Sequence, residues 1–270
     1  MMGLGYDIPA LAMRRQAGSG SAPFSPLALS PSAFFDPWRS ETMFQDPAGF
    51  LSASADGQPI GLWQDLSDAG NDLSQAISAA RPTYRTDGTD HWIEMDGVDD
   101  AMKTADIFDV ENPITMVLGY QMLSTSGTSR VNVAEISKTS TNGMSIGARP
   151  NIDRLQYYSR MSQNGVSASN LASPSIWGGH ARHVVSLRAV PSHVTVRMDG
   201  VPVIDTAQLL TTQSVASQPL RIGLGKVTGS IPGAFRLFGL QVWASQAAQP
   251  DTIQLDMLEQ WMADRIGVTL

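Results

Sequence analysis

Short apolar runs separated by turn residues follow one another along the chain after residue 33. The clearest runs are 113–122, which is almost wholly apolar, and the pair 182–190 and 193–203. Gly, Pro, Asp and Asn recur between the runs at a spacing of roughly ten residues, which is typical of an antiparallel sandwich or barrel. Further strands are expected at 59–67, 91–95, 131–137, 144–148, 155–161, 220–225 and 234–245.

The segment 91–96, HWIEMD, alternates between apolar and polar residues. Because successive side chains of a strand point to opposite faces, Ile93 and Met95 should share one face and Trp92, Glu94 and Asp96 the other. The pattern predicts that Ile93 and Met95 point into the core and that Trp92 does not.

A different period begins near the C-terminus. Apolar residues at helical spacing are Ile253, Leu255, Leu258, Trp261, Met262 and Ile266. Pro250 suits the first position of a helix and Gly267 a C-terminal stop, so one amphipathic helix is expected to close the domain. Its apolar stripe is expected in the core, and the apolar surroundings of Trp63 and Trp243 predict the same for them.

The N-terminal part of the chain has another composition. Residues 17–32, AGSGSAPFSPLALSPS, are rich in Gly, Ser and Pro, as extended or flexible segments are. We therefore expect an extended arm over residues 1–32 and a β domain over 33–270. The arm is expected to dock on another protein, and the alternative is packing against its own domain.

Composition narrows the classes of function. Charged residues make up 16% of the chain, the formal net charge is −7, and no block of basic residues occurs, which argues against nucleic-acid binding. The absence of cysteine excludes disulfides and thiolate metal sites. The N-terminus has no signal-peptide pattern, and no run approaches the ~20 apolar residues of a membrane span. These features predict a soluble protein that is made in the cytoplasm and does not insert into membranes.

The order of the segments carries a resemblance. GLWQDLSDAGNDLSQAISAARPTYR, WIEMDGVDDAM, ITMVLGYQM, HVVSLRAVPSHVTVRMDGVPV, LRIGLG and the C-terminal segment from residue 235 follow one another. Their succession, with the W-x-D-x-S motif of residues 63–67, resembles a LamG-like, concanavalin A-like domain over about residues 34–270. The resemblance implies an all-β, antiparallel jelly-roll sandwich. It implies little about function, because the fold carries lectins, glucanases and adhesion modules.

The segment FFDPWRSETMFQDPAGFLSASADGQPIGLWQDLS, residues 34–67, carries a narrower resemblance. It is similar to a lead-in found in structural proteins of tailed bacteriophages and phage-like gene transfer particles, namely spike, fibre and tail proteins. The resemblance implies a location on the particle surface and an arm, residues 1–32, that binds other particle proteins. It also implies sister subunits as partners, in a homo-oligomer, and the holding of host cell-surface polysaccharide.

The segment 94–100 contains four acidic residues: Glu94, Asp96, Asp99 and Asp100. The spacing E-x-D-x-x-D resembles the E-x-D-x-x-E of concanavalin A-like glucanases, whose retaining mechanism needs two carboxyl groups roughly 5–5.5 Å apart. Gly97 predicts a turn where a glucanase strand would continue, and the last position is the shorter Asp. We therefore expect no catalytic residues here.

The same carboxylates suit two other structures. Asp96, Asp99 and Asp100 are weak candidates for calcium ligands, since calcium binds clustered carboxylate oxygens. Short Asp side chains also cap the backbone amides of turns, and Asp-Gly is an ordinary turn pair. The turn is the favoured interpretation, so no metal or other cofactor is expected.

Sugar binding by such folds uses exposed aromatic rings, on which the CH groups of a sugar pack. Tyr157 and Tyr158 are adjacent in a predicted strand, so one of them should be exposed. Trp92 lies on the predicted non-core face, and Trp177 lies in the Gly-rich stretch SIWGGH. These four residues are the candidates for carbohydrate binding, with ordinary packing as the alternative for each.

Together these observations predict a non-enzymatic, virion-type surface protein of a phage or gene transfer particle that attaches to host cell-surface polysaccharide. Two alternatives remain open. One is a glycoside hydrolase or lyase that degrades a capsule, and the other is a decoration protein without a ligand.

Overall fold

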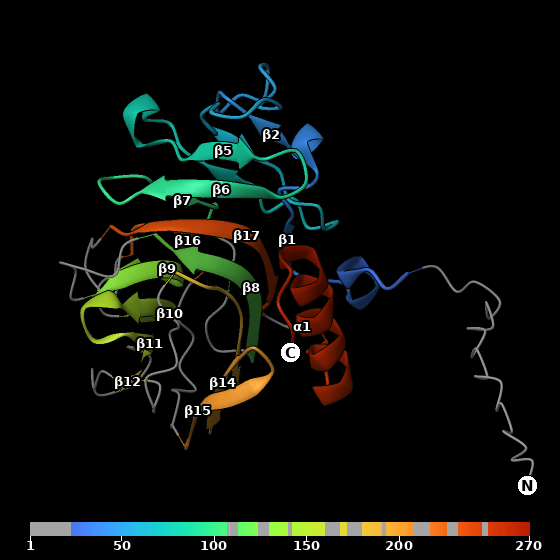
Figure 1. Cartoon of the computed structure of the whole chain (residues 1–270), viewed down its shortest axis with the longest axis vertical. Coiled ribbons are helices and arrows are strands. Elements are labelled where there is room, and N and C mark those ends of the chain that lie inside the picture. The colour runs from blue at the N-terminus through green and yellow to red at the C-terminus, as the bar shows by residue number, and fades with distance from the viewer. Residues whose placement is uncertain are drawn as a thin grey trace, which may run out of the picture.

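Two antiparallel sheets and one C-terminal helix make up the computed structural model (Figure 1). It describes residues 23–106, 108, 113–123, 130–139, 142–159, 168–171, 180–190, 193–207, 217–225, 232–244 and 248–270. The predicted all-β sandwich with a single C-terminal helix is confirmed.

Sheet A has the strand order β15-β14-β13-β8-β17-β6-β5, and β1 also pairs with β17. Its strands are β1 (Ala33–Phe35), β5 (Thr83–Thr86), β6 (His91–Asp96), β8 (Ile114–Met122), β13 (Arg182–Val190), β14 (His193–Met198), β15 (Val201–Ala207) and β17 (Ala234–Trp243).

Sheet B has the order β12-β11-β10-β9-β16-β7-β4-β3-β2. Its strands are β2 (Met43–Phe44), β3 (Leu62–Trp63), β4 (Leu73–Ser74), β7 (Met102–Lys103), β9 (Val131–Thr139), β10 (Asn142–Arg149), β11 (Arg154–Ser159), β12 (Ala168–Leu171) and β16 (Leu220–Ile222). Short 3₁₀ helices are η1 (Pro26–Leu29), η2 (Ser40–Thr42), η3 (Ser78–Ala80) and η4 (Pro150–Ile152).

Most strand predictions are confirmed, and the misses are short. The predicted run 193–203 is a hairpin: Asp199 and Gly200 have φ of 49° and 78° and separate β14 from β15, as a tight two-residue hairpin turn requires. The strands that the sequence pattern did not reveal include β1, β2, β4 and β12, which are two to four residues long. Two-residue strands carry no period, so only their pairing partners define them.

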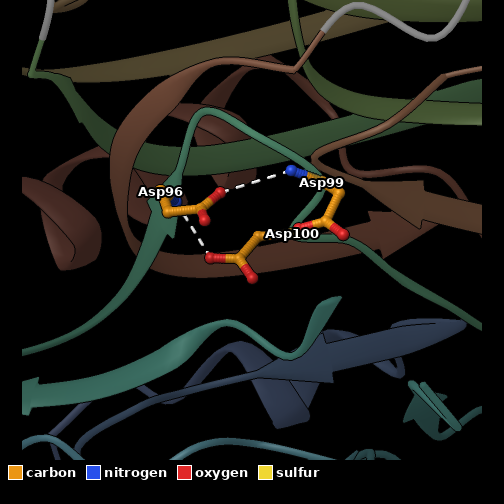
Figure 2. A group of neighbouring side chains, drawn as sticks. All are labelled: Asp96, Asp99 and Asp100. Carbon is orange, nitrogen blue, oxygen red and sulfur yellow. Dashed lines mark hydrogen bonds between the residues drawn. The ribbon is translucent and has the colours of Figure 1, made fainter. Parts of the chain in front are cut away.

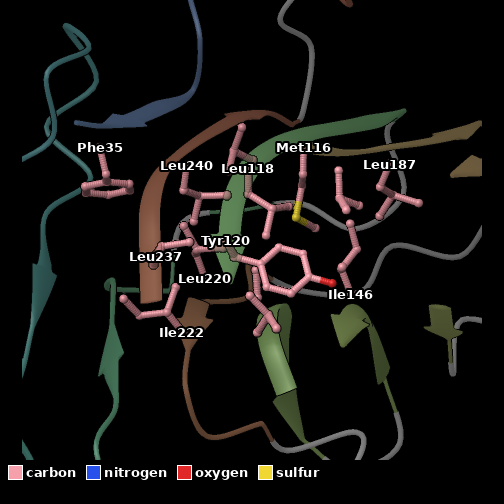
Figure 3. Packing of buried hydrophobic residues seen from close by; sticks show 14 of the residues in the cluster. Phe35, Met116, Leu118, Tyr120, Ile146, Leu187, Leu220, Ile222, Leu237 and Leu240 are labelled. Atoms are coloured by element: carbon pink, nitrogen blue, oxygen red, sulfur yellow. The ribbon is translucent and has the colours of Figure 1, made fainter. Parts of the chain in front are cut away.

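The main hydrophobic core lies between the two sheets. Figure 3 shows its side chains converging from both, with Leu118, Tyr120 and Leu240 from sheet A facing Ile146 and Leu220 from sheet B. Ile93 and Met95 belong to this core, as the alternation of 91–96 predicts. Burial of this many large apolar side chains is the dominant favourable term in folding.

A second hydrophobic cluster lies on the outer face of sheet A. Helix α1 (Thr252–Ile266) packs there, and contacts β8 and β13. Leu258 and Met262 of the helix meet Val117, Val184 and Phe238 of the sheet. The sheet is therefore covered on both sides at its centre, and Figure 1 shows the helix lying beside β8 and β17.

The ends of α1 agree in part with the sequence. Asp251 is the N-cap and forms a capping box with Gln254, so Pro250 precedes the cap rather than opening the helix. Gly267 ends the helix at φ 69°, as predicted. Ile253 is 72% exposed, so its predicted place in the apolar stripe is wrong. Among the described residues, no helix is long and apolar enough to cross a membrane.

Residues 23–32, the last part of the predicted arm, contact this chain's own sheet. Phe24 and Leu29 pack against the second cluster, and the indole Nε1 of Trp243 donates a 2.8 Å hydrogen bond to the Leu29 carbonyl. The Ser32 hydroxyl donates to the Ala244 carbonyl at 2.8 Å. Residues 23–32 therefore pack against their own domain, which was the alternative to docking on another protein. Residues 1–22 lie outside the described residues.

Gly119 of β8 lies directly beneath the helix. A Cβ at this position would lie 2.8 Å from the Met262 Sδ and 3.3 Å from the Ile266 Cδ1. We expect Gly119→Ala to lower the free energy of unfolding by about 1–3 kcal/mol through overpacking, and Met262→Ala to lower it by about 2–5 kcal/mol through a cavity. The double variant should lose less than the sum, because the new methyl group occupies space that Met262 vacates. Denaturant unfolding measures all three, and strictly additive losses would contradict this helix position.

Candidate functional site

Three of the four residues that the sequence suggested for sugar binding lie among the described residues, and all three, Trp92, Tyr157 and Tyr158, are buried. Tyr157 is fully buried in the main core and Tyr158 is 6% exposed, with the Arg130 guanidinium 4.9 Å from its ring centre. The expectation that one of the two tyrosines is exposed is therefore wrong. The alternation argument assumed a solvated outer face, but Glu135 and Ser145, on the same face of sheet B as Tyr158, are buried too.

Trp92 does lie on the predicted face, but that face is covered. Its ring packs against Phe238 in the second cluster, and the Arg236 guanidinium lies 4.7 Å from the ring centre. Its indole Nε1 donates to Glu94 Oε2 at 3.2 Å. Trp177, the fourth candidate, lies outside the described residues.

Glu94 contacts both Trp92 and Arg236. Its Oε2 accepts from the Arg236 Nε at 3.1 Å as well as from Trp92. The carboxylate at the first position of the E-x-D-x-x-D pattern is thus held by a cation and an indole within sheet A.

The acidic turn at residues 96–100 has the capping bonds predicted for it. Asp96 Oδ1 accepts from the amides of Val98 at 2.7 Å and Asp99 at 3.4 Å, and Asp100 Oδ2 accepts from the Asp96 amide at 2.9 Å. Figure 2 shows these three side chains around the reversal of the chain. The carboxylates therefore order the turn between β6 and β7.

The turn is also wedged between other strands. Gly97 has φ of 80°, and a Cβ at Gly223 would lie 2.3 Å from the Asp100 carbonyl oxygen. Asp100 is 6% exposed, and this burial raises the pKa of its carboxyl to about 7. The negative charges of Asp96 and Asp99 add to the rise, and the hydrogen bond from the Asp96 amide opposes it.

One carboxylate oxygen from each of Asp96, Asp99 and Asp100 lies within 4.8 Å of the others, which is compact enough for a cation. Calcium requires ionised ligands and usually six to eight oxygens. Here one oxygen of Asp96 and one of Asp100 already accept turn amides, and the most buried carboxyl, that of Asp100, has a raised pKa. Calcium at Asp96, Asp99 and Asp100 remains the alternative to the turn.

A groove lies along one side of α1. Its volume is about 640 Å³. It runs between the helix and the segment from Pro23 to Arg39, and its walls include Phe24, Phe34, Asp36, Met257, Gln260 and Trp261. Volume and mixed apolar and polar lining are those of a small-ligand site.

Trp261 is the aromatic wall of this groove. The ring is partly exposed, so the expectation that Trp261 lies wholly in the core is wrong, whereas Trp63 and Trp243 are fully buried as predicted. Phe34 meets the ring edge-on, with centres 5.5 Å apart and planes at 72°. The Arg265 guanidinium lies 4.2 Å from the ring centre. Both neighbours pack against the indole.

A buried ion pair anchors the same wall. Asp36 is 3% exposed and pairs with Arg265 at 3.1 Å, and the Trp38 amide donates to it at 3.1 Å. Burial raises the pKa of the Asp36 carboxyl, and the Arg265 charge opposes that rise. Burial likewise lowers the pKa of Arg265, against the effect of Asp36. The pair joins α1 to the chain after β1, and both residues line the groove.

Sequence reasoning missed this groove because Trp261 fits the apolar period of α1. The available signal was Arg265, four residues later and hence on the same helix face, where an arginine in a core stripe needs a partner. Phe50, which is 89% exposed, was also missed. Asp46 holds its loop by accepting from the amides of Phe50 and Leu51, but Phe50 is not part of the groove.

Comparison with solved structures supports the fold. The receptor-binding domain of botulinum neurotoxin D is similar with a TM-score of 0.60 and 6% identity, over 87% of this chain and 53% of that chain. The serotype D ligand-binding domain in complex with N-acetylneuraminic acid has a TM-score of 0.61 and 6% identity, over 88% and 53%. A Trypanosoma rangeli sialidase complex has a TM-score of 0.57 and 11% identity, over 98% and 37%.

This chain thus spans about half of the neurotoxin structures and less of the sialidase. The sequence matches no protein-family model and shows no significant similarity to a curated protein. At these identities the likeness establishes the fold: a jelly-roll-like sandwich of two antiparallel sheets.

The raised pKa of Asp100 makes a prediction about pH. The pKa of this carboxyl is 3.8 in the unfolded chain and about 7 in the folded protein. Between those values the folded state keeps a proton that the unfolded state has lost, so stability present below pH 3.8 is lost as pH rises through about 7. Asp100→Asn cannot ionise and still offers an oxygen to the Asp96 amide. Its stability relative to wild type should therefore increase with pH across this interval.

Denaturant midpoints of the two proteins, measured over that pH range, test this expectation. A difference that does not change with pH would contradict it. The series is repeated with EDTA and with calcium, where the turn predicts matching curves. Calcium-dependent stabilisation of the wild type alone would instead establish the metal site at Asp96, Asp99 and Asp100.

Proposed function

We propose that this chain is a glycan-binding module, and that the groove beside α1 is where it holds a saccharide. The observation that carries the proposal is the partly exposed Trp261 ring, against which Phe34 and Arg265 pack, at the side of a 640 Å³ groove. Sugar CH groups pack on such a ring, while neighbouring polar side chains accept and donate hydrogen bonds to hydroxyls.

The polar side chains of the groove suit hydroxyl groups. Gln260 donates to Asp264 at 2.7 Å, and both line the groove beside Trp261. Asp36 neutralises Arg265, and Arg39 pairs with Glu41 at 2.5 Å. Because Asp36, Arg265 and Arg39 each have an oppositely charged partner, binding here rests mainly on stacking and short hydrogen bonds and is only mildly sensitive to salt.

The solved structures of similar fold support this class of ligand. One is described as a complex with N-acetylneuraminic acid. Another, the serotype C neurotoxin structure, is described through its dependence on two ganglioside molecules for cell entry, with a TM-score of 0.55 and 10% identity over 74% of this chain. Sandwiches of this shape therefore serve as glycan-binding scaffolds in other proteins.

The finer proposal places the module on a particle. The lead-in of residues 34–67 resembles surface proteins of tailed bacteriophages and gene transfer particles, in which the arm binds the particle body and sister subunits assemble. We propose the same arrangement here, with several copies attaching to host cell-surface polysaccharide. Weak single sites then give useful adhesion, since linked sites gain avidity through effective concentration.

We also propose that the module binds without cutting. Glu94, the one glutamate of the glucanase-like pattern, pairs with Arg236, and the Asp residues that follow it cap a turn. The capsule-degrading hydrolase or lyase is the alternative that the binding experiment below also tests.

Removing the indole should weaken binding in the groove. On an array of bacterial surface oligosaccharides, Trp261→Ala should weaken binding at least about tenfold, or about 1.4 kcal/mol. Phe50→Ala is the matched control, because it removes an exposed aromatic ring outside the groove and should leave binding unchanged. Thermal melting confirms that both variants fold.

Equal binding by Trp261→Ala and wild type would refute the groove, and loss with Phe50→Ala would move the site to the Asp46 loop. Oligosaccharides recovered after long incubation should have their original length. Shortened products would support the hydrolase or lyase instead.

The particle proposal makes a prediction about two truncations. Deletion of residues 1–22 should leave the stability of the domain unchanged and abolish incorporation into the parent particle. Deletion of residues 1–30 should also lower the melting temperature, because it removes Phe24 and the Leu29 carbonyl that accepts from Trp243. Incorporation of the shorter truncation at wild-type level would contradict the anchoring role.

A further inference from the structure

A second concave site lies on the outer face of sheet A, beside the first turns of α1. Its volume is about 390 Å³. Ser186 and Arg188 of β13, Thr195 and Arg197 of β14, Pro202 of β15 and Leu255 of α1 line it. Figure 1 shows β14 and β15 forming the end of the sheet away from β6. Cross-strand register sets Ser186 opposite Arg197 and Arg188 opposite Thr195, so these four side chains share one face.

The two arginines of this pocket differ in their partners. Arg197 contacts Asp256 at 2.7 Å and Glu259 at 3.1 Å, and it donates to the Gly200 carbonyl at 2.9 Å. The Ser186 hydroxyl donates to the other oxygen of Glu259 at 2.5 Å. Arg197 is thus neutralised and held in place by α1.

Arg188 has no ion pair with any residue that the structure describes, and its Nε is buried without a hydrogen-bond partner. Asp205, the acidic residue of β15 on this face, contacts His193 and the Thr195 hydroxyl instead. A buried guanidinium Nε–H without an acceptor is costly, because this donor loses water without gaining a hydrogen bond. The pocket in front of Arg188 is where an acceptor would fit.

From this arrangement we infer that the pocket binds the carboxylate of an acidic monosaccharide unit, with Arg188 as its main ligand. A guanidinium presents paired N–H donors that match the two oxygens of a carboxylate. Pro202 and Leu255 supply apolar surface for the ring's CH groups, and the volume suits one sugar residue.

The surrounding charges select a single negative charge. Asp256 and Glu259 from α1 and Asp205 from β15 all lie close to the pocket walls. Among the described residues around the pocket, Arg188 is the arginine without a carboxylate partner, so it can pair with one carboxylate group, whereas a dianion such as phosphate meets stronger repulsion from the nearby acidic side chains.

This site goes beyond the proposed groove and is separate from it. The groove uses Met257, Trp261 and Asp264 of α1, whereas the pocket uses Thr252, Leu255 and Asp256. A Trp261→Ala protein should therefore bind an acidic sugar in the pocket normally, and either site can fail in experiment without the other.

The experiment titrates the full chain with glucuronate and, separately, with glucose at matched ionic strength, followed by backbone amide NMR shifts. Glucuronate should give saturable shifts in β13 and β14, and glucose should not. Arg188→Gln should weaken glucuronate binding at least tenfold, or about 1.4 kcal/mol. Arg188→Lys should be intermediate, since it keeps the charge without the paired donors. Arg85→Gln, which removes an arginine paired with Asp56 elsewhere, should change nothing.

Five outcomes would overturn the inference. Equal binding of glucose and glucuronate would exclude carboxylate recognition, and unchanged binding by Arg188→Gln would exclude Arg188. Equal weakening by Arg85→Gln would indicate non-specific charge. Tighter binding of inorganic phosphate than of glucuronate would exclude selection of a monoanion. If Arg188→Gln does not fold, full-strength binding by Arg188→Lys would likewise reject paired recognition.

Discussion

Burial of both faces of β8 and β17 is the constraint on which the other features of this molecule depend. Each strand contributes one row of side chains to the core between the sheets, and the opposite face to the cluster beneath α1. β17 pairs with β8 along one edge and with β6 and then β1 along the other. Because both faces are buried away from water, most residues of the two strands are apolar, and Thr115 and Gln241 are buried polar exceptions.

The helix on this sheet creates the two concave sites. A helix packed on a sheet leaves a groove along each of its two sides, and the segments of this chain next to each groove form its outer wall. On one flank the segment from Pro23 to Arg39 builds the groove of Trp261. On the other flank β14 and β15 build the pocket of Arg188. Gly119 permits the close approach of the helix, since a side chain there would push Met262 away.

Charge in these sites is balanced by partners from distant parts of the chain. Asp36 follows β1 and pairs with Arg265 of α1, and Glu259 of α1 pairs with Arg197 of β14. Buried ion pairs stabilise little in themselves, but leaving one partner alone is costly, so they fix the helix in one register on the sheet. Arg188 departs from this balance, which is the reason to assign it a ligand. In the acidic turn, the side chains of Asp96 and Asp100 accept hydrogen bonds from the turn's own backbone amides, so these amides need no partner from elsewhere in the chain.

The sequence by itself determined the sandwich, most of its longer strands and the helix. Strict alternation in 91–96, apolar filling in 113–122 and the helical period of 253–266 are local patterns, and each is enough to assign its element. The capping of the acidic turn was also local, because the bonds join residues within four positions of one another. Only the tertiary structure decided which faces of the strands and of the helix are exposed to solvent. Tyr158 and Trp92 lie on the side of their strands away from the main core, yet that side is buried, whereas Trp261 follows an apolar stripe and lines a groove. Exposure depends on which other segment packs over a face, and that segment lies far away in the sequence, where no local period records it.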